Sequence, residues 1–343
     1  MFIKNISILS LFVYLTLSLS LSSLAHAQST NGSVNSQRLE RAINSLLEDD
    51  VDAALEIVSD PMSPKIDKVT ILSLLAEYLE NKEADDTVFN VHMKIVSIVL
   101  MDKNKTDFGS DLSFSVCNSF DYVASKYHQT QELTTAMKVY TLLIGRCAQY
   151  TDPSIRAIVA RAFLNRGTAF YSDEKTKLFA QLDFVNLITE YEYDNDELTR
   201  ERVAKGYFNL AKTYLEEGLF EMALETIDKG IEKFKYAPEI SIKQQVSMLN
   251  YSKGVVFESL NDSDNAISAY WGLVTEYNDS DNEIIQEQVA KSKFNVANLL
   301  VKDAQRDKAI VLFQGVFERY KDSKNPALKQ ISTDARTRLK PNK

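Results

Sequence analysis

A 43-residue internal repeat is the feature that most constrains the fold of this chain. Three segments that begin at Val203, Val246 and Val289 align without a gap, and their starts are 43 residues apart both times. Periods of this length are typical of arrays in which each repeat is one supersecondary unit that buries its apolar side against its neighbours. The repeat therefore predicts an array of stacked, similar units.

The matched positions predict a helical hairpin in each unit. The first helix carries a large apolar residue, a small residue three positions later, and another large apolar residue after three more. The small residue lets the second helix approach closely, and that second helix opens with an alanine followed four positions later by a large apolar residue. In order along each unit, these positions are Phe208, Ala211, Tyr214, Ala223 and Ile227; Tyr251, Gly254, Phe257, Ala266 and Tyr270; and Phe294, Ala297, Leu300, Ala309 and Phe313.

Two earlier segments fit the same pattern with one-residue adjustments, so we expect the array to span residues 111–335. Residues 38–110 have helical apolar spacing and predict N-terminal hairpins, which are degenerate or capping repeats whose phase the sequence leaves open. Residues 336–343 predict a short basic tail. The two earlier segments contain Phe120, Ala124, Tyr127, Ala136 and Tyr140, and Leu164, Gly167, Phe170, Ala180 and Phe184.

The repeated positions resemble the tetratricopeptide repeat family over about residues 116–322. The resemblance implies an all-α fold, a right-handed solenoid of stacked antiparallel helical hairpins. The family repeat is usually about 34 residues long, whereas the units here have a period of 43. The extra residues fall between units, where longer first helices absorb them. The resemblance rests on the small residues Ala211, Gly254 and Ala297, the large residues Tyr214, Phe257 and Leu300, and the alanines Ala223, Ala266 and Ala309.

The resemblance also implies a binding surface. In this family the first helices line the concave face, and an asparagine one position after the large apolar residue often contacts a bound peptide. Lysines on the same helical faces predict an acidic or C-terminal peptide segment as the ligand. The alternative is that the lysines are only solvated and the asparagines bond to the neighbouring hairpin. The predicted peptide-binding groove comprises Asn165, Lys205, Asn209, Lys212, Lys291, Asn295, Asn298 and Lys302, and Ser252 departs from the asparagine pattern.

The first 27 residues predict an export signal. Lys4 precedes an apolar run from Ile6 to Leu24, and Ala25-His26-Ala27 follows as a cleavage site. An uncleaved membrane anchor is the alternative, because the apolar run is nearly long enough to span a bilayer. We expect cleavage, a flexible leader over residues 28–37, no stable membrane insertion afterwards, and a location in the periplasm or outside the cell.

The two cysteines, Cys117 and Cys147, predict a disulfide bond. Exported proteins commonly pair their cysteines. Cys117 lies near the start of the first helix of its unit and Cys147 at the end of the second, and these ends meet in an antiparallel hairpin. Two buried free thiols are the alternative, since cysteine also packs as a small apolar residue.

The sequence contains no pattern that carries chemistry. The net charge of −9 argues against a nucleic-acid or anionic-membrane surface. His92 and His128 lie far apart without metal-ligand partners at helical spacing, and there is no phosphate-binding loop or nucleophile elbow. We therefore expect no cofactor, no metal and no catalytic site, but a scaffold that binds a partner protein or peptide of unknown identity. The alternatives are a structural spacer in a cell-envelope complex and an enzyme with an unrecognised site.

Overall fold

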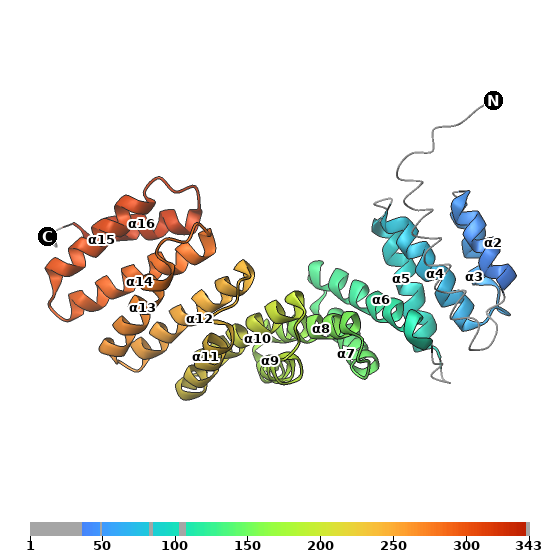
Figure 1. Cartoon of the computed structure of the whole chain (residues 1–343), viewed down its shortest axis with the longest axis horizontal. Helices are drawn as coiled ribbons and strands as arrows, with labels where there is room; N and C mark the ends of the chain where they lie inside the picture. Colours follow the sequence, from blue (N-terminus) through green and yellow to red (C-terminus); the bar gives the residue numbers. More distant parts are fainter. Residues whose placement is uncertain (1–35, 49, 82–84, 103–107, 341–343) are drawn as a thin grey trace, which may run out of the picture. The chain divides into compact units, whose positions relative to one another are not determined.

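The computed structural model of the chain describes residues 36–48, 50–81, 85–102 and 108–340. Within these ranges the secondary structure is entirely helical, and successive helices form antiparallel hairpins (Figure 1). This confirms the predicted all-α fold of stacked hairpins. The predicted export signal and most of the predicted leader lie outside the described residues.

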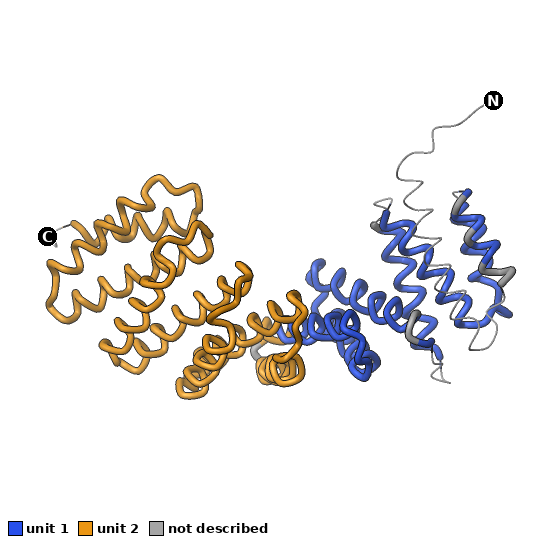
Figure 2. Tube along the Cα trace, viewed as in Figure 1, with its two compact units in different colours: residues 1–169 blue, residues 170–343 orange. Residues whose placement is uncertain are grey.

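The chain divides into two compact units, residues 1–169 and 170–343 (Figure 2). The first unit contains α2 (Ser36–Leu47), α3 (Val51–Ser59), α4 (Lys65–Glu80), α5 (Asp85–Leu100), α6 (Gly109–Gln129), α7 (Leu133–Cys147) and nearly all of α8 (Pro153–Tyr171). The second contains η1 (Glu174–Thr176), α9 (Lys177–Tyr191), α10 (Glu197–Glu216), α11 (Phe220–Phe234), α12 (Ile240–Ser259), α13 (Ser263–Tyr277), α14 (Glu283–Lys302), α15 (Arg306–Tyr320) and α16 (Pro326–Arg338). The region predicted to hold N-terminal hairpins thus consists mainly of α2–α5.

A left-handed residue follows the first helix of each of the three aligned repeats and reverses the chain. In the three aligned repeats this residue is Gly218, Asn261 or Ala304, with φ of 73°, 59° and 58°. The amide of the following residue then donates back to a carbonyl five positions earlier, as Leu219 does to Tyr214 at 2.9 Å. This is the Schellman arrangement, in which the left-handed residue lets the chain satisfy the last carbonyls of the helix. The repeated turn therefore sets the hairpin geometry in these three repeats, whereas the 3-10 helix η1 lies between α8 and α9.

The small residues of the pattern are contact points between the paired helices. The alanines that open the second helices, Ala223, Ala266 and Ala309, are completely buried. At Gly254 an added Cβ would lie only 2.3 Å from a ring carbon of Tyr270, closer than real side chains approach. Tyr270 is itself completely buried, so the glycine makes room for a large ring against α12. Substituting Gly254 by alanine would force the ring or the helix to move.

Unit 1 contains the Cys117–Cys147 disulfide bond, which links α6 to the last residue of α7. The two Cα atoms are 6.1 Å apart, and both residues are completely buried. The hairpin brings the two cysteines together. The structure therefore contains the predicted disulfide bond and not the alternative of two free thiols. A bridge that closes a loop of this length stabilises a fold by roughly 3 kcal/mol through the entropy of the unfolded chain.

Candidate functional site

The predicted groove residues all lie on first helices. In unit 2 the first helices pack in the order α10, α12, α14 and α16. The structure therefore places one set of predicted residues on α10 and another on α14, and α12 lies between the two sets. Asn165 lies apart from both, on α8 in unit 1. The α10 set is Lys205, Asn209 and Lys212, and the α14 set is Lys291, Asn295, Asn298 and Lys302.

Of the three predicted asparagines that follow a large apolar residue, two bind a tyrosine of the preceding hairpin. The Nδ2 of Asn165 donates to the Tyr140 hydroxyl at 3.1 Å, and the Nδ2 of Asn295 donates to the Tyr270 hydroxyl at 3.0 Å. In both pairs the tyrosine lies 25 residues before the asparagine. The corresponding residue for Asn209 is Phe184, which has no hydroxyl. Asn209 therefore differs from the other two, since this hydrogen bond is impossible for it.

Three of the four predicted lysines, Lys205, Lys212 and Lys291, lie beside carboxylates of their own helices. Lys205 lies 2.5 Å from Glu201, and Lys291 lies 2.5 Å from Glu287, so the same pair recurs two repeats apart. The ammonium of Lys212 lies 4.9 Å from the centre of the Tyr171 ring. Such surface ion pairs stabilise by about 0–1 kcal/mol, so a ligand carboxylate can compete for the lysines at little cost. The predicted peptide-binding groove is therefore mixed in charge on α10 and around Lys291, and not purely basic.

A hollow of about 870 Å³ in unit 2 contains the two remaining predicted residues, Asn298 and Lys302. Arg306 from α15 and Arg338 from α16 line the same hollow, and neither was predicted as a site residue. Arg338 was expected in a basic tail, but α16 continues to this residue and holds it on the last helical turn. For Arg338 the sequence signal was the cluster of basic residues near the C-terminus, and Arg306 had none.

This C-terminal hollow has a net positive lining. Its carboxylates are Glu258, which accepts a hydrogen bond from Tyr270 at 2.7 Å, and Asp334, which accepts one from Gln330 at 2.9 Å. Against these two stand the cations of Lys302, Arg306 and Arg338, and apolar atoms of Phe294, Val301 and Ile310 line the rest. The combination suits a short segment that carries a carboxylate beside an apolar side chain.

Unit 1 has a smaller polar hollow, of about 570 Å³, around Asn165. Arg161 forms an ion pair there with Asp121, whose carboxylate is almost completely buried. Burial also lowers the pKa of His128 at the edge of this hollow, because the neutral ring needs less solvation than the charged one. The site can therefore accept polar groups, with Arg161 and Lys126 as its cations.

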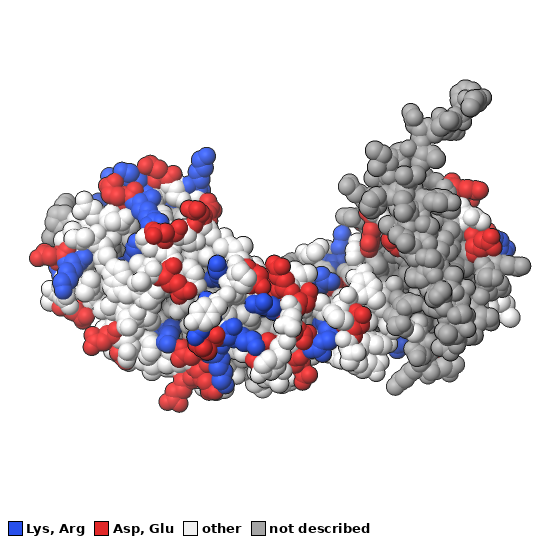
Figure 3. All heavy atoms as spheres, in the orientation of Figure 1, with Lys and Arg blue, Asp and Glu red and all other residues white. Residues whose placement is uncertain are grey.

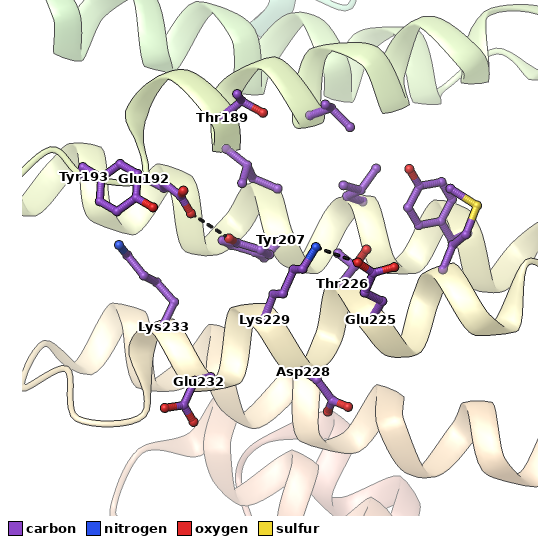
Figure 4. A pocket seen from close by; sticks show the side chains of 15 residues that line it. Thr189, Glu192, Tyr193, Tyr207, Glu225, Thr226, Asp228, Lys229, Glu232 and Lys233 are labelled. Atoms are coloured by element: carbon purple, nitrogen blue, oxygen red, sulfur yellow. Dashed lines mark hydrogen bonds and ion pairs between the residues drawn. The ribbon is translucent and has the colours of Figure 1, made fainter.

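A third hollow, a groove of about 790 Å³, lies among α9, α10 and α11 (Figure 4). The hydroxyl of Tyr207 donates to Glu192 at 3.1 Å, and Lys229 lies 2.6 Å from Glu225. Burial, reinforced by Glu192, raises the pKa of Tyr207. Lys233 reaches over the ring of Tyr193, 4.3 Å from its centre. Sequence patterns did not predict this groove, although α9 is apolar on more than one face.

The described ranges hold no cluster of three or more histidine, cysteine, aspartate or glutamate side chains arranged to bind a metal ion. None of the helices described there has the length and apolar character needed to span a bilayer. On the face of unit 2 seen in Figure 3, basic and acidic side chains are interspersed.

A family model described as tetratricopeptide repeat matches residues 204–232, which run from α10 to α11. The chain is similar in fold to the apo form of RapI, at 14% identity and a TM-score of 0.56, over 90% of this chain and 86% of that one. It is also similar to a signal-transduction ATPase with a tetratricopeptide repeat sensor from Pyrococcus horikoshii, at 15% identity and a TM-score of 0.52, over 87% of this chain and 44% of that one. No curated protein sequence matches the chain. The chain thus contains one matched tetratricopeptide repeat, at residues 204–232, within a fold of stacked helical hairpins.

Proposed function

We propose that this protein is a non-enzymatic scaffold that binds a segment of a partner protein in unit 2, at the hollow among α14, α15 and α16. The observation that carries the proposal is the C-terminal hollow, where Asn298 and Lys302 meet Arg306 and Arg338. Repeat arrays of this kind present extended surfaces formed by successive helices, which suit extended or helical peptide segments.

The lining of the hollow favours an acidic segment or a C-terminal carboxylate as the ligand. Guanidinium groups bind carboxylates through two parallel hydrogen bonds, and the hollow offers Arg306 and Arg338 on two different helices. The amide of Asn298 can satisfy the peptide backbone, while Phe294 and Val301 can cover an apolar side chain. The excess of cations is local, because the chain as a whole has a net charge of −9.

Fluorescence anisotropy with labelled decapeptides of Leu, Ala and Glu tests this proposal. We expect the peptide with a free carboxylate to bind more tightly than its amidated form, and a version with Lys in place of Glu not to bind. The double variant Arg306→Ala/Arg338→Ala should weaken binding at least tenfold. Lys308→Ala/Lys329→Ala removes the same charge from the same two helices outside the hollow and is the matched control. Equal losses in both double variants would contradict the site.

The proposed location is outside the cytoplasm, after cleavage behind Ala27. The buried Cys117–Cys147 bridge supports this location, because structural disulfides persist mainly in oxidising compartments. N-terminal sequencing of the protein from its own cells should find Gln28 as the first residue. A protein that retains Met1 would contradict cleavage without affecting the proposed peptide site.

A further inference from the structure

Helix α9 has an exposed apolar stripe, two members of which, Val185 and Thr189, also line the groove among α9, α10 and α11. Leu178, Leu182 and Val185 are 72%, 56% and 37% exposed, and the exposed Thr189 continues the line. Their spacing of four, three and four residues is the heptad spacing that keeps side chains along one seam between two packed helices. The stripe is therefore shaped to contact another helix lying along α9.

No other second helix of the array has such a stripe. The second helices α7, α11, α13 and α15 each expose one large apolar residue, whereas α9 exposes four, including Phe179. Every exposed residue of α9 between positions 178 and 189 is uncharged, although charged residues make up 25% of the chain. The single exposed residues on the other helices are Leu142, Met222, Trp271 and Val311.

The charges at the two ends of the stripe have opposite signs. Lys175 lies at its N-terminal end, next to Lys177, which pairs with Glu216 of α10 at 3.6 Å, and Glu190 and Glu192 lie at its C-terminal end. Lys175 and Glu192 are equally far from the midpoint of the stripe. A second α9 packed antiparallel about that midpoint would place Lys175 opposite the partner's Glu192, whereas parallel packing would place like charges together.

We propose that α9 is a homodimer contact in which the α9 helices of two copies of this chain pack antiparallel. In this arrangement Leu182 meets the partner subunit's Val185, and Leu178 meets the partner subunit's Thr189. The contact uses the same surface on both copies, which is the commonest form of a two-fold interface. Two copies of a chain with a net charge of −9 repel each other. Repulsion is smallest at the uncharged stripe, where Lys175 of one copy would face Glu192 of the other. The contact is independent of the proposed peptide site.

Sedimentation equilibrium of the purified full-length protein, as the cell processes it, tests the contact. We expect a reversible monomer–dimer equilibrium and at least a tenfold weaker association for Leu182→Asp. The fold should tolerate this change because Leu182 is 56% exposed. Val311→Asp, at a 69% exposed position on α15, is the matched control and should dimerise like the parent. Lys175→Glu should weaken the dimer several-fold, since it places carboxylates opposite each other.

Cysteine crosslinking tests the antiparallel orientation. Under mild oxidation, a mixture of the Leu182→Cys and Val185→Cys variants should form mixed dimers faster than either variant crosslinks with itself. A protein that is monomeric at all concentrations would overturn the proposal, and so would a dimer that Leu182→Asp leaves intact. Preferential self-crosslinking of Leu182→Cys would overturn the antiparallel arrangement. A monomer that binds phosphatidylcholine vesicles through Leu182 would assign the stripe to a lipid surface instead.

Discussion

The neighbouring second helices α9 and α11 have similar inner sides and opposite outer sides. Their buried positions match in kind: Phe184 in α9 corresponds to Ile227 in α11, and Tyr191 corresponds to Phe234. At the outer positions, however, each residue of the α9 stripe is replaced in α11 by a carboxylate. The outer residues are Leu178, Leu182, Val185 and Thr189 in α9, and Glu221, Glu225, Asp228 and Glu232 in α11.

The difference shows that the repeat constrains only the side of each hairpin that its neighbours cover. Buried positions are restricted because a void or an overpacked ring costs several kcal/mol, typically about 2–5 for a truncated core residue. Exposed substitutions usually change stability by less than about 0.5 kcal/mol, so outer sides can diverge without loss of the fold. The fold therefore does not require the apolar outer side of α9, and its role has to be tested by association rather than by stability.

Truncating the inner sides should have the largest effect and should be similar in both helices. We expect Phe184→Ala to lower the free energy of unfolding by about 3–5 kcal/mol and Ile227→Ala by about 2–5 kcal/mol, because both side chains are buried and leave cavities. Urea unfolding followed by circular dichroism measures both. A loss below about 1 kcal/mol in either helix would show that its inner side is not a core.

Exchanging the outer sides should alter association much more than folding. The variant Leu178→Glu/Leu182→Glu/Val185→Asp/Thr189→Glu gives α9 the outer residues of α11. We expect the free energy of unfolding to fall by only about 1 kcal/mol, from repulsion between the new carboxylates, while dimers disappear. Urea unfolding and sedimentation on the same samples separate the two effects. Cooperative loss of the helical signal at zero urea would mean that the stripe is part of the core after all.

Asn209 of α10 should respond to a hydroxyl supplied by α9. Phe184→Tyr places a hydroxyl where Tyr140 and Tyr270 have theirs, and we expect it to accept a hydrogen bond from Asn209. The expected gain in the free energy of unfolding is about 0.5–1.5 kcal/mol. Tyr270→Phe removes both the bond from Asn295 and the bond to Glu258, so it should lower stability by more than Phe184→Tyr raises it. If Asn209 recognises a partner, Phe184→Tyr should also weaken that binding.

Raising the pH should lower the free energy of unfolding through Tyr207, and this effect should be smaller than those of the substitutions above. Burial and Glu192 raise the pKa of Tyr207 from its ordinary value of 10.0. Above that value the unfolded chain releases the proton while the folded chain retains it, so stability falls as the pH rises. Tyr207→Phe should lose less stability between pH 9 and about 11 than the parent does, because the released proton is that of Tyr207. Tyr236→Phe, at an exposed position, is the control and should behave like the parent.

The sequence by itself determined the repeat, the helical hairpins and the small residues between them. These depend on local spacing, because residues three and four positions apart share one side of a helix whatever surrounds it. The same spacing placed Cys117 and Cys147 at meeting ends of one hairpin. It also placed Asn298 and Lys302 on one side of α14, although their role in binding stays a prediction.

Only the tertiary structure decided which partners those residues have. Asn295 bonds to Tyr270 from the preceding hairpin, and Arg306 and Arg338 reach the hollow of Lys302 from two other helices. The stripe on α9 likewise depends on the neighbours, since that helix is apolar on more than one side and its own sequence does not say which side they cover. Local periodicity fixes which residues share a face, but burial is a property of the packed array, because it depends on the helices that lie against that face.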